Sequence, residues 1–311
     1  MSAGWRQQRE RGSQALVRFM CWLASRVGRP PARLLLYPIT AYFVLTSPVA
    51  RRASRDFLSR VHGRRAGPLA IFRHLHTFAA VILDRVYFLM GDTDRFDVRV
   101  HGYEQVMEAV GGRGMVLLGS HLGSFDAVRC MGMKGYGLRL KVHMQHEHNQ
   151  FITRLLESLN PEVAASVIPV GGPDSMLRTS EWLDEGGSVG MLGDRVASVR
   201  RSCRCEFLGG EALFPTGPWW LARRLGVPVV LFFGLYRGGR RYDIHLQVMD
   251  QEGGDHGLCH TVQAYAEILE GYARDAPDNW FNFYDFWDEG VSGTVAHGAG
   301  GPVAPDKRGG G

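Results

Sequence analysis

The sequence predicts an α/β fold, with a mixed, mostly parallel central sheet flanked by helices and preceded by an N-terminal membrane-associated helical element. Short strand-like runs alternate with helical stretches of about ten residues, which is typical of βαβ units. Residues 115–118 (MVLL) are wholly apolar, as expected of a strand that is buried on both faces of a parallel sheet. The chain is basic up to about residue 65 and net acidic after it, which separates the N-terminal segment from the α/β part.

The first 65 residues are strongly basic. They carry thirteen Arg and no Lys against one Glu and one Asp, a net charge of +11, which leaves −6 for the rest of a chain whose total is +5. A basic segment is attracted to an anionic surface, either nucleic acid or lipid. Because these arginines are interleaved with Leu, Phe, Trp and Tyr, we favour anionic lipid.

Residues 34–50 (LLLYPITAYFVLTSPVA) contain no charged side chain and lie between Arg33 and Arg51. This length is at the lower limit for crossing a bilayer about 30 Å thick, and Pro38 and Pro48 interrupt a straight helix. We expect a helical element in or on the cytoplasmic leaflet, with a single span and a buried core helix as the alternatives.

The rest of the chain follows a regular pattern. Strands are expected at residues 96–100, 115–118, 138–144, 163–170, 188–192, 227–236 and 242–249. Helices are expected at residues 69–90, 103–110, 124–133, 150–159, 174–185, 217–225 and 258–274, with Asp174 and Thr216 as N-caps. The chain thus divides into a membrane-anchoring segment (1–65), an α/β domain (66–290) and a Gly- and Pro-rich disordered tail (291–311).

The motif GSHLGSFD, residues 119–126, follows the apolar run and opens a helix. Active groups of open α/β sheets collect at the carboxyl ends of strands, where His121 is expected. A turn at Gly123 would bring Asp126 against the imidazole, orienting His121 while its other ring nitrogen faces an acceptor hydroxyl. Acyl transfer to an alcohol requires such a general base, because the hydroxyl must lose its proton as it attacks. Gly123 and Ser124 are then expected to bind substrate, near helix N–H groups that can stabilise an oxyanion.

Two other interpretations of this motif stay open. Ser120 or Ser124 can act as a nucleophile beside His121, although neither lies in a G-x-S-x-G elbow. Alternatively, His121 and Asp126 only cap a helix, because this spacing also arises by chance.

A second polar motif, Asp194-Arg195, follows the strand expected at residues 188–192. Arg195 is a candidate ligand for a phosphate or for the donor's carbonyl oxygen, and Asp194 is expected to orient Arg195 or the acceptor. The alternative is a solvated loop that carries an Asp–Arg pair. Three further arginines would extend a phosphate site: Arg200, Arg201 and Arg204.

Two apolar segments are candidate walls of an acyl-chain groove. The first is a loop expected over residues 207–218, in which Thr216 and Gly217 open a helix and are candidate substrate-binding residues. The second is the aromatic run at residues 280–287 (WFNFYDFW), which can cover a lipid groove or touch the membrane interface. Core packing competes with both explanations, and for the aromatic run we favour it.

The five cysteines are odd in number and widely spaced, which predicts no disulfide framework and a reducing compartment. No metal site is expected. Cys203 and Cys205 form an isolated C-x-C pair without a second pair nearby. The run His143, His146 and His148 is more typical of a polar strand end than of a ligand set.

Together these motifs resemble the bacterial lysophospholipid-acyltransferase superfamily, specifically the late acyltransferases of lipid A biosynthesis, over roughly residues 10–290. That family has a membrane-embedding N-terminal helix, an H-x4-D/E dyad, an Asp-Gln pair after a later strand, and an F-G…T-G-P…LAR segment. The dyad positions are His121 and Asp126, and the Asp-Gln position resembles Asp194-Arg195. The later segment resembles Phe207, Gly209, Thr216-Gly217-Pro218 and Leu221-Ala222-Arg223. Asp in the dyad and Arg after Asp194 depart from the usual Glu and Gln, and the opening Trp5…Glu10-Arg11-Gly12 resembles a divergent branch of the superfamily.

The resemblance implies an acyltransferase that moves a fatty-acyl group from an acyl-carrier-protein or coenzyme A thioester to a hydroxyl of a membrane (glyco)lipid. It places the protein on the cytoplasmic face of the inner membrane. No cofactor is implied, and the expected partners are membrane lipids and the thioester donor rather than nucleic acid. Two rival functions remain: a lipid or thioester hydrolase that uses the same dyad with water, and a non-catalytic lipid-binding protein with a decayed site.

Overall fold

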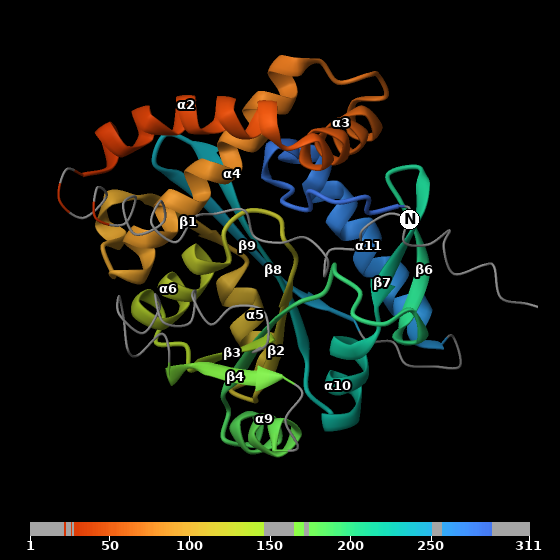
Figure 1. Cartoon of the computed structure of the whole chain (residues 1–311). Helices are drawn as coiled ribbons and strands as arrows, with labels where there is room; N and C mark the ends of the chain where they lie inside the picture. The colour runs from red at the N-terminus through yellow and green to blue at the C-terminus, as the bar shows by residue number, and fades with distance from the viewer. Residues whose placement is uncertain are drawn as a thin grey trace, which may run out of the picture.

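The computed structural model describes Trp22, Arg26 and residues 28–145, 165–170, 174–250 and 257–287. Seven strands of this part form one sheet in the order β1-β9-β8-β2-β5-β3-β4 (Figure 1). Its neighbouring strands are parallel except for β8 and β9. The predicted α/β fold with a mixed, mostly parallel sheet is confirmed.

The bounds of the elements agree closely with the sequence pattern. The strands of the sheet are β1 (Asp97–His101), β2 (Met115–Gly119), β3 (Leu140–Gln145), β4 (Val167–Val170), β5 (Ser188–Leu192), β8 (Val229–Gly238) and β9 (Arg241–Met249). The helices are α2 (Arg29–Thr46), α3 (Pro48–His62), α4 (Pro68–Leu89), α5 (Tyr103–Val110), α6 (Phe125–Gly135), α9 (Ser175–Asp184), α10 (Gly217–Leu225) and α11 (Gly257–Asp275), with short 3₁₀ turns η2 (Thr93–Arg95), η4 (Val199–Arg201) and η5 (Pro277–Asn279). The helix expected at residues 150–159 and the tail at 291–311 lie outside the described residues.

The sheet separates two apolar layers, because successive side chains of a strand point to opposite faces. On β2, Val116 and Leu118 belong to the same buried cluster as residues of α10 and α11. Met115 and Leu117 belong to a second cluster with residues of α5 and α6. All five β2 residues are buried, which explains why the run MVLL carries no polar side chain.

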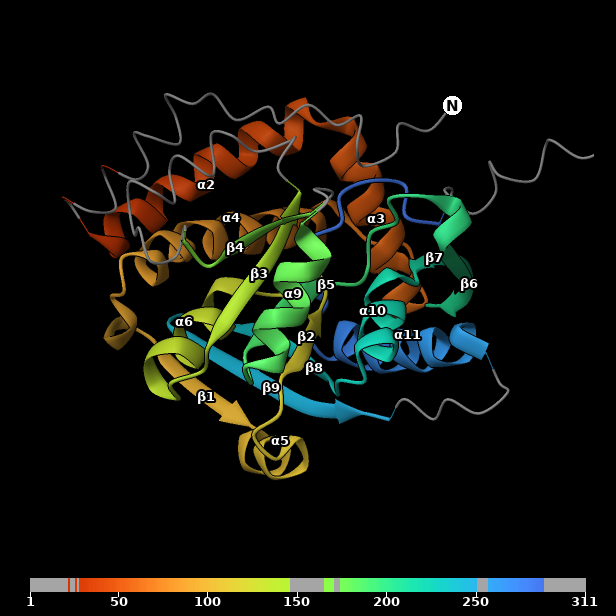
Figure 2. The ribbon, with the colours of Figure 1, turned by 90° about the horizontal axis from the view of Figure 1, so that it is seen from below.

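Helices α2 and α3 form a bent pair that packs on α4 (Figures 1 and 2). The chain turns by 96° between them, where Pro48 opens α3 after Ser47. Proline suits a first helical turn because its missing N–H is not needed there. Of the described helices, none is by itself both long and apolar enough to cross a membrane. Only the bent pair taken together reaches that threshold, by length and composition.

A buried ion pair holds α2 on the body. Arg29 donates to Asp84 of α4 from Nε over 2.7 Å and from Nη2 over 2.8 Å. Tyr242 of β9 donates its hydroxyl to the same carboxylate over 2.9 Å, and Asp84 is fully buried. With this side fixed inward, α2 exposes most of its large apolar side chains: Leu34, Leu35, Tyr37, Tyr42 and Leu45.

The hairpin of β6 (Ser202–Phe207) and β7 (Gly210–Pro215) was not predicted. The expectation of a loop over residues 207–218 is wrong for residues 210–215, because these residues form β7 and pair with β6. Leu208 and Gly209 form its two-residue turn with φ values of 52° and 70°. Positive φ at both positions is typical of hairpin turns. Leu is unusual at the first position, so the sequence does not indicate a hairpin there.

The expectation that the cysteines form no disulfide is wrong for one pair. Cys203 of β6 is bonded to Cys259 of α11, which lies 56 residues later. The hairpin packs along α11, and this long-range contact cannot be inferred from spacing. Because Cys203 is bonded, it cannot form a zinc site with Cys205, which is a free, buried cysteine.

Candidate functional site

His121 and Asp194 lie at corresponding positions after two adjacent strands. In the parallel pair β2 and β5, Gly119 is the register partner of Leu192. His121 comes two residues after Gly119, and Asp194 comes two residues after Leu192. Gly193 N–H donates to Gly119 O over 2.8 Å and continues the pairing. The register therefore brings His121 and Asp194 together at the carboxyl edge of the sheet, where open α/β folds place active groups.

Asp194 contacts His121 at two nitrogen atoms. The backbone N–H of His121 donates to Oδ2 over 3.0 Å, and the ring Nδ1 lies 2.9 Å from Oδ1 and 3.1 Å from Oδ2. Because an ionised carboxylate only accepts, Nδ1 carries the hydrogen and Nε2 is left as the basic nitrogen. The Asp194 side chain is fully buried while 27% of the His121 side chain is exposed, so the imidazole can meet a substrate and its partner is shielded from water.

The electrostatics of the pair favour an ionised Asp194 and a neutral His121. Burial raises the pKa of Asp194, but the charge and hydrogen bonds of His121, with Arg195 and Asn282, outweigh burial and lower the pKa to about 2. Burial lowers the pKa of His121, Arg195 lowers it further, and Asp194 opposes both. A neutral imidazole at physiological pH is the form that a general base requires.

Asp126 does not lie in the place predicted for it beside His121. It is the second residue of α6, and its Oδ2 accepts from Arg85 Nε of α4 over 2.8 Å. α6 packs on α4, which directs this nearly buried carboxylate toward α4. Among the hydrogen bonds of the described residues, the carboxylate contact of His121 is made by Asp194 instead. A role for Asp126 in the reaction stays a prediction.

Gly123 and Ser124 shape the turn between His121 and α6. Gly123 has a φ of 78°, and a Cβ there would lie 2.1 Å from the carbonyl oxygen of Gly234 on β8, so only glycine fits. Ser124 is the N-cap of α6, and its hydroxyl accepts from Ala127 N–H over 3.1 Å. Ser124 is therefore occupied as a cap, which argues against its use as a nucleophile.

Arg195 shares the corner of the sheet with His121, whereas Thr216 and Gly217 open α10. Arg195 Nε donates to Asn282 Oδ1 over 2.8 Å. Thr216 is the predicted N-cap, and its N–H donates to Arg201 O over 3.0 Å. Among the described contacts of Thr216 and Gly217, none reaches His121. Substrate binding by these three residues stays a prediction.

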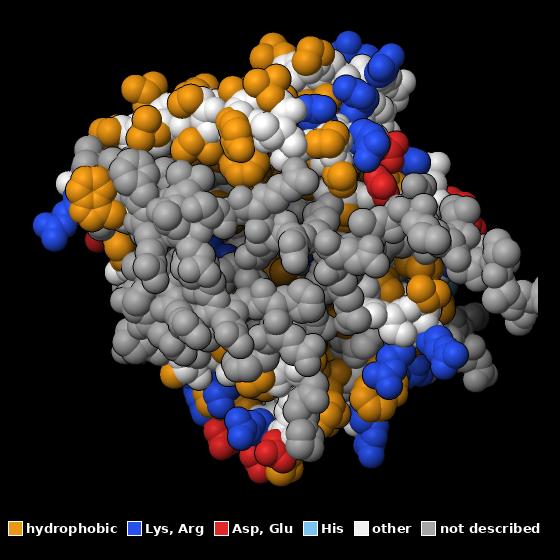
Figure 3. Space-filling model, in the orientation of Figure 1, with side chains coloured by type: hydrophobic (Ala, Val, Ile, Leu, Met, Phe, Trp, Pro, Cys, Tyr) orange, Lys and Arg blue, Asp and Glu red, His pale blue; other side chains and the backbone are white. Residues whose placement is uncertain are grey.

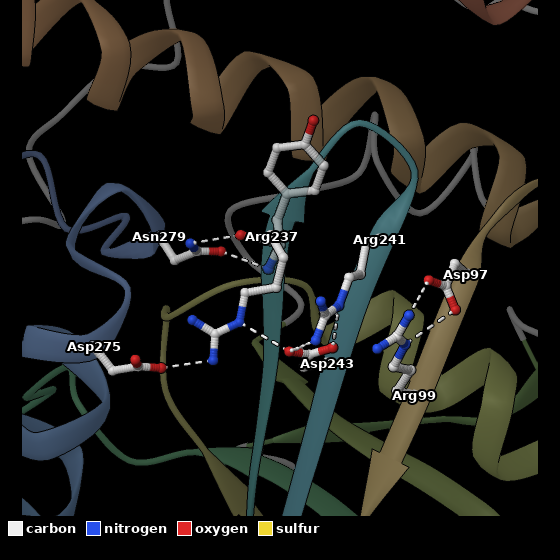
Figure 4. Close-up of polar contacts among 8 residues, drawn as sticks. Asp97, Arg99, Arg237, Arg241, Asp243, Asp275 and Asn279 are labelled. Carbon is white, nitrogen blue, oxygen red and sulfur yellow. Dashed lines mark hydrogen bonds and ion pairs between the residues drawn. The ribbon is translucent and has the colours of Figure 1, made fainter.

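Three residues of this site were not predicted from the sequence. Asn282 Nδ2 donates to Asp194 Oδ2 over 2.6 Å, and the Tyr265 hydroxyl of α11 donates to Gly119 O over 2.8 Å. Asn279 exchanges hydrogen bonds of 2.8 and 3.0 Å with the backbone of Tyr236 at the end of β8 (Figure 4). The available signal was a lone Asn within the aromatic run. Five aromatic members of that run are buried, which confirms the favoured core packing: Trp280, Phe281, Tyr284, Phe286 and Trp287.

A second polar cluster lies near the turn between β8 and β9. The ligand atoms of His101, Asp243 and His245 lie within 4.8 Å of one another, as a metal site would require. However, the Asp243 carboxylate accepts from Arg241 over 2.9 and 3.0 Å and from Arg237 over 3.1 Å (Figure 4). Two guanidinium groups neutralise the carboxylate and repel a cation, so we assign this cluster to the stability of the sheet.

His143, from the histidine run of β3, bonds to Thr179 Oγ1 through Nε2 over 2.8 Å. Burial lowers its pKa to about 4. His146 and His148 lie outside the described residues. The described part of the run, His143, is therefore a half-buried strand residue that is bonded to a helix residue.

Residues 70–288 match a family model described as bacterial lipid A biosynthesis acyltransferase. The match covers more than half of the 311 residues. It includes both motifs at the carboxyl edge of the sheet and the segment that carries Asn282. No curated protein matches the chain.

Proposed function

The chain belongs to the bacterial lipid A biosynthesis acyltransferase family, and we propose that His121 is the general base with which it acylates a hydroxyl group of a membrane lipid. The proposed donor is a fatty-acyl thioester of acyl-carrier protein or coenzyme A, and the proposed acceptor is a (glyco)lipid. The observation that supports this most directly is a partly exposed imidazole whose Nδ1 is held 2.9 Å from a buried carboxylate.

In the proposed reaction, Nε2 of His121 takes the proton of the acceptor hydroxyl as its oxygen forms a bond to the thioester carbonyl carbon. Asp194 stabilises the imidazolium that results. Collapse of the tetrahedral intermediate breaks the C–S bond, and the imidazolium returns the proton to the departing thiolate. The products are an ester and a free thiol, with no covalent enzyme intermediate. Arg195, whose charge acts on His121, is the proposed ligand for a phosphate of the donor or acceptor.

Lipid mass spectrometry of a deletion strain tests this function. We expect the strain to accumulate a lipid lighter by one acyl chain. Wild-type protein should restore the parent species, whereas His121→Ala should not, although it folds. Full restoration by His121→Ala would overturn the proposed role of the imidazole.

Hydrolysis is the second candidate, because water can replace the acceptor at the same base. Purified protein in detergent should consume a fatty-acyl thioester quickly only when the lipid extract of the deletion strain is added. Equal consumption with and without that extract, with release of free fatty acid, would favour the hydrolase.

The exposed face of α2 supports a membrane-bound enzyme, which we propose reaches its lipid from the cytoplasmic leaflet. Figure 3 shows hydrophobic side chains gathered along α2 beside a group of basic side chains toward α3. Leu34 and Leu45 are 70% and 76% exposed, and α3 adds Arg51, Arg52 and Arg55. Apolar side chains next to arginines are typical of an element that lies in an anionic interface.

Fractionation tests this placement. The double variant Leu34→Glu, Leu45→Glu should move much of the protein from the membrane to the soluble fraction. The matched control is Leu177→Glu, because Leu177 is 60% exposed on α9, far from α2 in Figure 1. Equal membrane retention of the double variant and the control would contradict the proposed role of α2.

A further inference from the structure

The segment 279–282 is bonded to the backbone on both sides of Leu122, the residue that follows the candidate base. Gly123 N–H donates to Asn279 O over 2.8 Å, and Phe281 N–H donates to His121 O over 2.7 Å. Between these two bonds, Leu122 and Trp280 form an isolated antiparallel bridge. The backbone of the segment thus fixes the position of His121, and its last side chain reaches Asp194.

The side chain of Asn282 lies between Asp194 and Arg195 and is buried, with 2% of the residue exposed. Nδ2 donates to Asp194 Oδ2 over 2.6 Å, and Oδ1 accepts from Arg195 Nε over 2.8 Å. This orientation of the amide is the one that satisfies both partners, because an ionised carboxylate cannot donate and a guanidinium cannot accept. One neutral group therefore separates two opposite charges that are consecutive in the chain.

We propose that Asn282 is a positioning residue, which keeps the Asp194 carboxylate turned toward His121 and the Arg195 guanidinium away from that carboxylate. This inference rests on the proposed function, since it names the residue on which the His121–Asp194 pair depends. Without the amide, Arg195 would be able to pair directly with Asp194, and guanidinium–carboxylate pairs are often bidentate. Such a pair would compete with His121 Nδ1 and weaken the support of the imidazolium.

The charged groups that act on the pair are few among the described residues. The charges of Asp194 and Arg195 shift the pKa of His121, and those of His121 and Arg195 shift the pKa of Asp194. Tyr265 of α11 also faces Asp194, but burial and that charge raise the pKa of its hydroxyl well above the usual value, so Tyr265 stays neutral. The basicity of His121 therefore depends on how Asp194 is shared between His121 and Arg195.

Three variants of the full-length protein in detergent test this role. Asn282→Asp keeps the shape and the acceptor for Arg195 but places a second carboxylate against Asp194. Asn282→Ala removes both hydrogen bonds. The matched control is Thr179→Val, which removes the hydrogen bonds of a fully buried hydroxyl on α9 to Ser175 O and His143 Nε2 and none to Asp194. The readouts are kcat, KM for a fatty-acyl thioester, the pH profile of kcat/KM with lipid extract as acceptor, and the NMR titration of the His121 ring.

Asn282→Asp should move the acidic limb of the profile, and the ring titration of His121, upward by about one pH unit, because adjacent carboxylates hold a proton more tightly and add negative charge near the imidazole. Asn282→Ala should lower kcat by about 100-fold with KM within about twofold, as expected when a catalytic group is slightly misplaced. Thr179→Val should lower the unfolding temperature but leave the acidic limb in place.

The inference is overturned if Asn282→Asp has the wild-type profile and ring titration and Asn282→Ala loses no more turnover than Thr179→Val. In that case loss of activity in His121→Ala would still support the proposed function. Failure of the proposed function itself would give a different result. Full activity of His121→Ala would overturn the proposed base and, with it, the dependence on Asn282.

Discussion

Asp194 binds both the backbone N–H and the ring Nδ1 of His121, although the two residues are 73 positions apart in the chain. Asp126, five residues after His121, binds Arg85 instead. The nearer carboxylate in sequence is therefore not the nearer one in space, and variants of the two aspartates distinguish their roles.

Asp194→Asn should lower turnover by about 10³- to 10⁴-fold with the fold intact, because an amide cannot support the imidazolium and favours the wrong tautomer. Asp126→Asn should lower turnover by about tenfold or less, since its direct loss is the contact with Arg85. Steady-state kinetics of the two variants gives the comparison. A larger loss in Asp126→Asn would reverse the assignment.

The rate should depend on pH through His121. Burial and Arg195 lower the pKa of His121 from its ordinary value near 6.5, and the active form is the neutral one. The neutral form therefore persists to lower pH than for a free imidazole. The profile of kcat/KM should be flat at neutral pH and fall only below about pH 6.5. An acidic limb centred above pH 7 would contradict this prediction.

The Arg29–Asp84 pair should be important for stability. Asp84→Asn leaves a buried guanidinium without its counter-charge, which typically lowers the free energy of unfolding by about 3–5 kcal/mol. Asp56→Asn is the matched control, because Asp56 pairs with Arg60 at an exposed position of α3 and its loss should cost below about 0.5 kcal/mol. Chemical denaturation measures both. Similar values for the two variants would show that the buried pair is replaceable.

His74 links stability to pH. It is fully buried, bonds to Ser54 Oγ over 2.8 Å, and contacts Trp280 O; burial lowers its pKa to about 4. As the pH falls from 6.5 to 4, the unfolded chain gains a proton that the folded one resists, so the free energy of unfolding should fall by up to about 3 kcal/mol. Denaturation against pH should give a shallower slope for His74→Gln. An equally steep slope for His74→Gln would exclude this linkage.

Local pattern was sufficient for most of the fold. α5, β5 and α10 have the bounds that the sequence predicts, because helical or strand periodicity and the residues that cap it are contained within a few neighbouring residues. The hairpin β6–β7 was not predicted, because Leu208 stands at a turn position of positive φ where Asn, Asp or Gly is usual.

Polar residues directly after an apolar run are visible without a structure, so the amino-acid order alone shows which polar groups stand at the carboxyl ends of buried strands. His121 and Asp194 were both found in this way. Which of these groups meet depends on the folded chain: the adjacent positions of β2 and β5 in the sheet, the disulfide from Cys203 to Cys259, and the contact of Asn282 with Asp194. The physical reason is that these contacts join residues 56 to 88 positions apart, and they form when helices and strands bury their apolar faces together, which no local spacing encodes.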